Sequence, residues 1–103
     1  MHKKQDELGR FSDPSLLILA SLASGPRHGY AMMEDISQFS GTRLEPGTLY
    51  AALTRLERRG WIEALDTEER RRPYRITPSG RRTFQTRMSE LRDYQLMLRG
   101  LAT

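Results

Sequence analysis

Between residues 47 and 58, leucines alternate with small polar residues and arginines. Of all the patterns in the chain, this one gives the clearest indication of a binding surface. Leu49, Leu53 and Leu56 recur at steps of four and three, which predicts a helix with one buried face. The opposite face carries small residues first and arginines later: Thr48, Ala51, Arg55 and Arg58, with Thr54 beside them and Tyr50 at the border. Such a helix can bring its first turn close to base edges in the major groove, so this face is a candidate DNA-reading surface. A solvated face without a partner is the alternative.

An arginine-rich loop follows this helix. Its basic residues, Arg70, Arg71 and Arg72, are candidates for contact with DNA phosphates. Three acidic residues precede them in the loop, and these either limit indiscriminate binding or pair with the arginines. Trp61 lies where the helix meets the first strand, and we expect it to fill the core and not to stack on a base.

The chain offers little for catalysis. Its two histidines, His2 and His28, lie in the N-terminal segment and at a helix start, and no HExxH spacing or glycine-rich phosphate loop is present. It has no cysteine, which excludes thiolate nucleophiles, thiolate metal sites and structural disulfides. We therefore expect a protein that is not an enzyme and needs neither a metal nor a cofactor.

Length and charge point to one domain with an anionic partner. The chain has 103 residues, a net charge of +4 and a sequence pI of about 10.0, which favours nucleic acid over a membrane, although an ordinary charge surplus would look similar. The first residues contain no apolar leader, and the longest apolar run, 16–20, is too short to span a bilayer. A cytoplasmic location is expected.

The helices that must position these residues have clear start and stop signals. Asp13 and Pro14 open the first helix, which Gly25 and Pro26 end. The second helix is expected from about His28 to Phe39, and the third begins at Pro46 and ends at Gly60; Thr77 and Pro78 then open a last helix that runs to about Arg99. Two short strands, Trp61–Leu65 and Pro73–Thr77, lie between the third and last helices.

This order predicts a mostly α fold with a small β-hairpin: a winged helix-turn-helix over residues 13–77 and a C-terminal dimerisation helix over 78–103. Residues 1–12 are expected to form a mobile arm or a short helix that packs on a partner, and Lys3 and Lys4 in this arm can add DNA contacts.

The last helix carries a heptad seam. Its members are Phe84, Met88, Leu91, Tyr94, Leu98 and Leu101, and Leu96 and Met97 broaden it. The seam could pack on its own domain, but three other helices already surround a small core, so we expect it to join two copies. Two recognition helices related by a two-fold axis would then read a palindromic site.

Four ordered segments resemble the PadR-type transcriptional regulators: Gly25–Tyr30, Gly47–Leu53, Leu56–Ile62 and Tyr74–Gly80. The resemblance covers about residues 16–80, and the last helix fits the short form of the family. It implies a winged helix-turn-helix, usually a repressor, and a homodimer formed through the last helix and the first, which carries Leu16 and Leu19. It also implies that Tyr30, Gly47, Thr48 and Tyr50 lie near the DNA.

Two departures from the family pattern are visible. Proline often follows the tyrosine of the recognition helix, where this chain has Ala51, so the contacts there can differ. Some short members bind flat aromatic drugs between tryptophans of the last helix, where this chain has only Phe84 and Tyr94. A small aromatic effector remains a candidate partner, but the last helix of this chain lacks the tryptophans of that drug site.

The expected function is that of a bacterial repressor that binds double-stranded operator DNA as a homodimer. One alternative is a winged-helix docking module whose basic surface meets an acidic protein and reads no DNA sequence. A second is a ligand-binding dimer in which the last helices form the sensing site and DNA release is the response.

Overall fold

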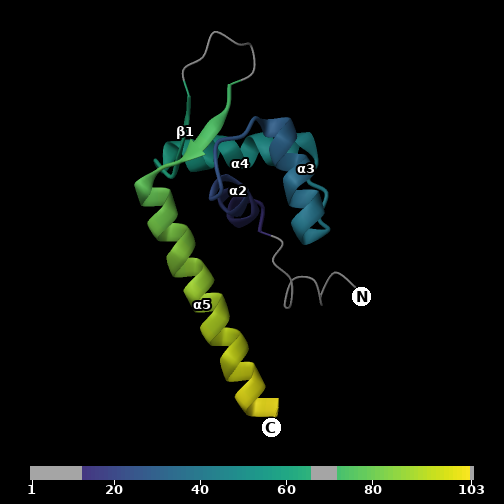
Figure 1. Ribbon diagram of the computed structural model, residues 1–103, viewed down its shortest axis with the longest axis vertical. Helices are drawn as coiled ribbons and strands as arrows, with labels where there is room; N and C mark the ends of the chain where they lie inside the picture. The colour runs from purple at the N-terminus through teal and green to yellow at the C-terminus, as the bar shows by residue number, and fades with distance from the viewer. Residues whose placement is uncertain (1–12, 66–71, 103) are drawn as a thin grey trace.

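The computed structural model describes residues 13–65 and 72–102 (Figure 1). Its elements follow the order α2 (Pro14–Leu22), α3 (Gly29–Ser40), α4 (Pro46–Arg58), β1 (Ile62–Ala64), β2 (Tyr74–Ile76) and α5 (Pro78–Ala102). The prediction of a mostly helical fold with one antiparallel hairpin and a C-terminal helix is confirmed, and the helix bounds differ from those expected by a few residues. The predicted N-terminal arm, with Lys3 and Lys4, lies outside the described residues, as do Arg70 and Arg71.

Helix α2 is the centre of the core. It packs against α3, α4, α5 and β2, and its apolar residues are buried on nearly every side. Helices α3 and α4 and the hairpin each add apolar side chains to the same cluster: Met32, Ile36, Leu49, Leu53, Leu56, Ile62 and Ile76. Each fully buried leucine or isoleucine contributes about 1.5–3 kcal/mol relative to its exposed state. The leucine face predicted for residues 49–56 is therefore the inner face of α4.

The helix ends follow from local hydrogen bonds. The Asp13 carboxylate accepts a hydrogen bond from the Ser15 amide at 3.0 Å, which caps α2 as expected. Helix α3 ends at Gly41, which adopts a left-handed conformation at φ +73°, and its amide donates to the Ser37 carbonyl. Thr77 caps α5, because its hydroxyl oxygen accepts a hydrogen bond from the Gly80 amide at 3.0 Å.

The hairpin is short and tied to the start of α3. Ile62 pairs with Ile76 on the buried side, whereas Glu63 and Arg75 pair on the exposed side with a 3.0 Å salt bridge. The backbones of Arg27 and Tyr74 exchange two hydrogen bonds, of 3.1 and 2.9 Å, so the segment before α3 lies alongside β2. The hairpin and α3 are thus held in one arrangement.

A polar cluster also ties the segment before α3 to α2 and α3. The Arg27 side chain donates a hydrogen bond to the Ser21 carbonyl at 3.1 Å and lies 3.5 Å from the Asp35 carboxylate. The buried Ser21 hydroxyl donates to the same carboxylate at 2.7 Å. These contacts join α2, α3 and, through the backbone of Arg27, the hairpin. Removal of the Asp35 carboxylate would take away the acceptor of the Ser21 hydroxyl, and this loss costs stability because the hydroxyl is buried.

Helix α5 leaves the domain after its first turns. Phe84 packs against the core, but beyond it the helix extends away from the other elements (Figure 1). Its 25 residues correspond to about 38 Å, a large part of the 56 Å length of the molecule. The heptad residues after Phe84 are therefore exposed in a single copy.

Gly80 fixes the angle at which α5 leaves the hairpin. A Cβ atom there would overlap the Trp61 carbonyl oxygen and lie 3.0 Å from Cγ1 of Ile76. We expect Gly80→Ala to lower the free energy of unfolding by about 1–3 kcal/mol, because overpacking of this kind must shift backbone. Chemical denaturation measures the change.

Gly47→Ala is the matched control. Gly47 also lies in a helix, but its added Cβ would meet no described atom within 4 Å, so the substitution should raise the free energy of unfolding by up to about 1 kcal/mol. Equal midpoints for the two variants would show that α5 does not depend on the close approach at Gly80.

Candidate nucleic-acid interface

The outer face of α4 is free of the rest of the described chain. Because Leu49, Ala52, Leu53 and Leu56 are buried, the residues about half a turn away are the most outward. The centre of this face consists of Gly47, Ala51, Thr54 and Arg58, all exposed. Small side chains therefore occupy its first two turns and an arginine its end, the order predicted from the sequence. Thr54 donates its hydroxyl proton to the Tyr50 carbonyl at 3.0 Å, which leaves its oxygen able to accept.

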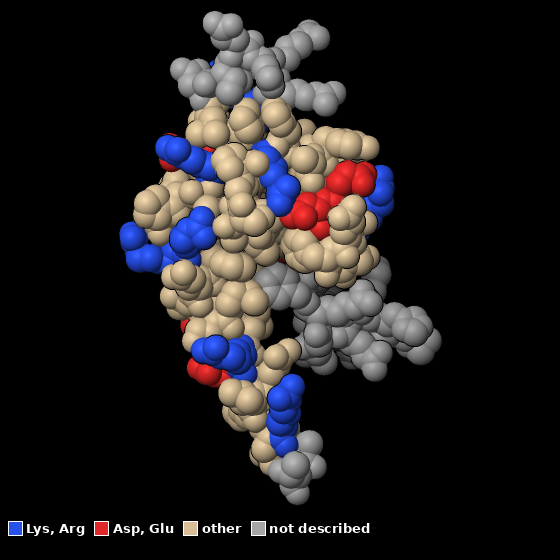
Figure 2. Space-filling model, in the orientation of Figure 1, with Lys and Arg blue, Asp and Glu red and all other residues tan. Residues whose placement is uncertain are grey.

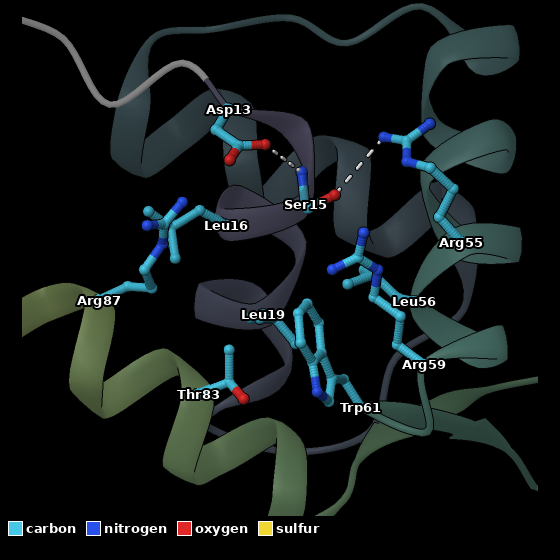
Figure 3. Close-up of a pocket in the computed structure, with 10 residues that line it drawn as sticks. All are labelled: Asp13, Ser15, Leu16, Leu19, Arg55, Leu56, Arg59, Trp61, Thr83 and Arg87. Carbon is cyan, nitrogen blue, oxygen red and sulfur yellow. Dashed lines mark hydrogen bonds between the residues drawn. The ribbon is translucent and has the colours of Figure 1, made fainter.

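Arg55 lies on a flank of α4. Its guanidinium points to the start of α2, where Nη2 is 3.5 Å from the Ser15 hydroxyl (Figure 3). Thr48 is on the same flank by helical spacing, about two turns earlier. Arg58, and not Arg55, is the arginine at the centre of the exposed face. The sequence indicates this position, because residue 58 follows residue 51 by about two helical turns and therefore lies on the same face.

Tyr50 lies on the opposite flank, beside a hollow of about 500 Å³. The hollow lies between the start of α3, the start of α4 and β2. It is lined by His28, Gly29, Tyr30, Met33, Pro46, Tyr50, Arg72 and Tyr74. Tyr30 and Tyr50, both expected near DNA, are about half exposed, so the fold brings them together with two residues that the sequence did not single out for this surface, His28 and Tyr74.

The contact between Gly29 and Tyr50 shapes this hollow. A Cβ on residue 29 would be 2.8 Å from the Tyr50 hydroxyl oxygen and 3.2 Å from the ring carbon that carries it. A side chain at position 29 would therefore push the end of the Tyr50 ring away from the start of α3. The dipeptide Gly29-Tyr30 was visible in the sequence, but its partner is 21 residues away and no local pattern indicates it.

Tyr74 contributes a hydroxyl that stays protonated. Burial raises the pKa of Tyr74 above its usual value of 10.0, and Glu57 and Tyr50 raise it further, whereas Arg72 lowers it. A tyrosine with this pKa is neutral at physiological pH, so its hydroxyl can donate a hydrogen bond to an anion in the hollow.

The charges of the surface are mixed. Arg72 is exposed beside the hollow at the end of the hairpin loop, whereas Arg75 is held by Glu63. Figure 2 shows arginine side chains spread over one face of the molecule and along α5, and an acidic patch over α3. The acidic patch over the middle of α3 is unfavourable for contact with DNA phosphates.

Two kinds of site are missing from the part of the chain that the structure describes. Residues 13–65 and 72–102 contain no cluster of three or more His, Cys, Asp or Glu side chains that could hold a metal ion. None of their helices is long and apolar enough to cross a membrane.

Comparison with known proteins places this fold among transcriptional regulators. Residues 18–86 match the model of the "Transcriptional regulator PadR-like family". A transcriptional regulator from Clostridium thermocellum is 31% identical, with a TM-score of 0.73 over 82% of this chain and 85% of that one. A PadR family transcription regulator from Clostridium difficile has a TM-score of 0.78 over 87% and 98% of the two chains, and at 23% identity it shows the fold alone.

A curated relative is longer. An uncharacterized 37.1 kDa protein in transposon TN4556 of Streptomyces fradiae is 46% identical over 76 residues. The matched region covers 74% of this chain but 22% of that relative, so the chain corresponds to about a fifth of the longer protein.

Proposed function

Because the chain belongs to the PadR-like family of transcriptional regulators, we propose that it binds a palindromic site on double-stranded DNA as a homodimer and represses transcription in the bacterial cytoplasm. The observation that supports this most is the exposed face of α4, with small residues in its first turns and, on one flank, a tyrosine-lined hollow that Arg72 also lines. This arrangement suits a helix that enters the major groove by its N-terminal end.

Gly47 supports a close approach to DNA at the start of α4. Glycine destabilises a helix relative to alanine, and a Cβ at this position would meet no described atom of the protein within 4 Å. No contact among the described residues therefore requires glycine here. A base edge or sugar that approaches the backbone from outside would require it, and Thr48 and Ala51 leave the same side uncrowded.

The tyrosine hollow fits a DNA phosphate. Tyr30 and Tyr50 each offer a hydroxyl at its edge, and the neutral Tyr74 offers a third. The hollow lies at the start of α3, where the backbone amides of the first turn and the helix dipole favour an anion. Arg72 adds a positive charge at the rim. These groups would hold the backbone on one side of the groove while α4 reads the bases.

The hairpin loop and the N-terminal arm would add further phosphate contacts, through Arg70, Arg71, Lys3 and Lys4. On the other flank, Arg55 would contact DNA only after leaving Ser15, so Arg58 is the better candidate for the central position of the face. A dimer that neutralises about eight phosphates would lose about three to four orders of magnitude in affinity between 50 and 200 mM salt.

Helix α5 is proposed as the dimer contact. Met88, Leu91, Tyr94, Leu98 and Leu101 are exposed along the same side of the helix, and an exposed apolar stripe of this length is typical of an interface. Leu16, Leu19 and Phe84, which the sequence also assigned to the interface, are largely covered by their own domain. The second copy would therefore contact mainly the part of α5 beyond Phe84.

Gel-shift titration with a palindromic probe from the promoter of the gene itself tests the whole proposal. We expect Gly47→Ala to weaken binding about tenfold, equivalent to about 1.4 kcal/mol, although it stabilises the fold. Gly100→Ala, a helical glycine of α5 that also has open space at its Cβ, should keep wild-type affinity. If wild-type protein binds an acidic protein but no promoter sequence in preference to others, the docking alternative is correct.

The hairpin loop has its own test. Replacing Arg70, Arg71 and Arg72 with alanine should weaken binding to all sequences alike and reduce the slope of log affinity against log salt by up to about 3 per subunit. The control replaces Arg82, Arg92 and Arg99 of α5 with alanine, which removes the same charge away from the hairpin. Loss of salt dependence in the control alone would show that the loop does not hold phosphates.

Leu91→Asp tests the dimer. A carboxylate in an apolar seam lacks a partner, so the dimer dissociation constant should rise at least tenfold, and sedimentation equilibrium measures it. Ser89→Asp adds the same charge two residues earlier, on the other side of the helix, and should leave the dimer intact. A monomeric wild-type protein would exclude the two-fold arrangement.

A further inference from the structure

The first turns of α4 expose methyl groups and no long hydrogen-bonding side chain. Ala51 and Thr54 are exposed at the centre of its outer face, and Thr48 is exposed on a flank. Residues 46–54 include no Arg, Lys, Asn or Gln. These four residue types make the paired hydrogen bonds that identify guanine or adenine in the major groove. The part of α4 that enters the groove first therefore lacks the usual side chains for reading purines.

The polar atoms at the centre of this face are partly engaged within the helix. The Thr54 hydroxyl donates to the Tyr50 carbonyl at 3.0 Å, so its proton is not available to a base, although its oxygen can still accept. Ala51 has no polar side-chain atom. Hydrocarbon is thus what the centre of the face offers to a base edge.

The arginines of α4 are poorly placed to read the same bases. The Arg55 guanidinium is directed at the start of α2, with Nη2 3.5 Å from the Ser15 hydroxyl (Figure 3). Arg58 follows Ala51 by seven residues, about 10.5 Å along the helix axis. When a helix enters the groove by its N-terminal end, its last turn is nearer to the phosphates than to the base edges. Arg58 therefore suits a backbone contact better than a guanine.

Short side chains reach a base only when the helix backbone lies deep in the groove. Gly47 meets this condition, because it is exposed on the same face and the space around its missing Cβ is open to 4 Å. A carbon atom of Ala51 or Thr54 can then come within about 4 Å of a base, the distance of an apolar contact.

We propose that α4 identifies thymine by its C5-methyl group, through apolar contact with Ala51 and with the methyl groups of Thr54 and Thr48. This inference rests on the proposed binding of DNA and specifies what the helix recognises there. Thymine alone among the four bases carries a methyl group in the major groove. Burial of one such group is equivalent to about fourfold in affinity, and two symmetric half-sites multiply this to about fifteenfold.

The proposal has a consequence that a hydrogen-bond code does not share. 5-Methylcytosine carries its methyl group at the same ring position as thymine, so apolar contact would accept it. Its amino group would also meet the Thr54 oxygen, which can accept a hydrogen bond. Methylation of a cytosine at this position would therefore strengthen binding.

Base substitution in a selected site tests the proposal. The full-length chain selects its best duplex from a random pool, and each constant thymine is then replaced by uracil in both half-sites, which removes only the methyl group. Gel-shift titration should show about fifteenfold weaker binding for at least one such pair. With cytosine at the same pair, 5-methylation should recover about fourfold or more.

Three protein variants remove the methyl groups on the other side of the contact: Thr48→Ser, Ala51→Gly and Thr54→Ser. The readout is the ratio of thymine to uracil affinity, which cancels any loss of folded protein because both duplexes meet the same preparation. At least one variant should reduce this ratio to about fourfold or less at one thymine pair. Thr83→Ser, which removes a methyl group from α5, is the control and should keep the wild-type ratio.

Four results would overturn the proposal. They are a selected site without a constant thymine, uracil substitutions that all change affinity by less than about twofold, a wild-type ratio in all three variants, and weakening by 7-deazaguanine without any effect of uracil. The last result would assign the reading to an arginine. Sequence preference without a uracil effect rejects this inference alone, whereas binding without any sequence preference rejects the proposed function as well.

Discussion

The packing of α4 on α2 is the interaction on which the other surfaces depend. Leu49, Leu53 and Leu56 bury one side of α4 completely, which leaves the opposite side exposed over its whole length. The two flanks then receive different neighbours, the start of α3 with β2 on one and α2 with α5 on the other. A single burial pattern thereby creates an exposed helix face with a hollow on each side of it.

The position of the hairpin is fixed by contacts that few residues provide. Arg27 pairs its backbone with Tyr74 and its side chain with Asp35 and the Ser21 carbonyl, so one residue connects the hairpin, α3 and α2. Thr77 adds a second connection, because its hydroxyl donates to the Gly60 carbonyl at 2.6 Å while it caps α5. The hairpin itself has only three paired residues on each strand and depends on these supports.

Helix α5 has a first part that packs on the domain and a longer second part that extends beyond it. Its first turns pack on the domain through Gly80 and Phe84, and the rest carries an apolar stripe that no described part of the same copy covers. Because α5 is long, a small change in its angle to the domain would displace its far end by a larger distance.

Much of the fold was determined by the sequence on its own. The caps at Asp13 and Thr77, the leucine spacing of α4 and the heptad seam of α5 depend on residues within about four positions of one another, so local reading found them. The family resemblance, which rested on four ordered segments, is confirmed by the match over residues 18–86. The same local signals gave the order of helices and strands.

Only the tertiary structure decided what lies beside what. The contact of Gly29 with Tyr50, the link from Arg27 to Asp35 and Tyr74, and the turn of Arg55 toward Ser15 each depend on how separate elements pack. The same is true of the two hollows and of the burial of Leu16 and Leu19 within one copy. Such contacts join residues that are distant in the chain, so no spacing rule encodes them, and the balance of packing between helices sets them.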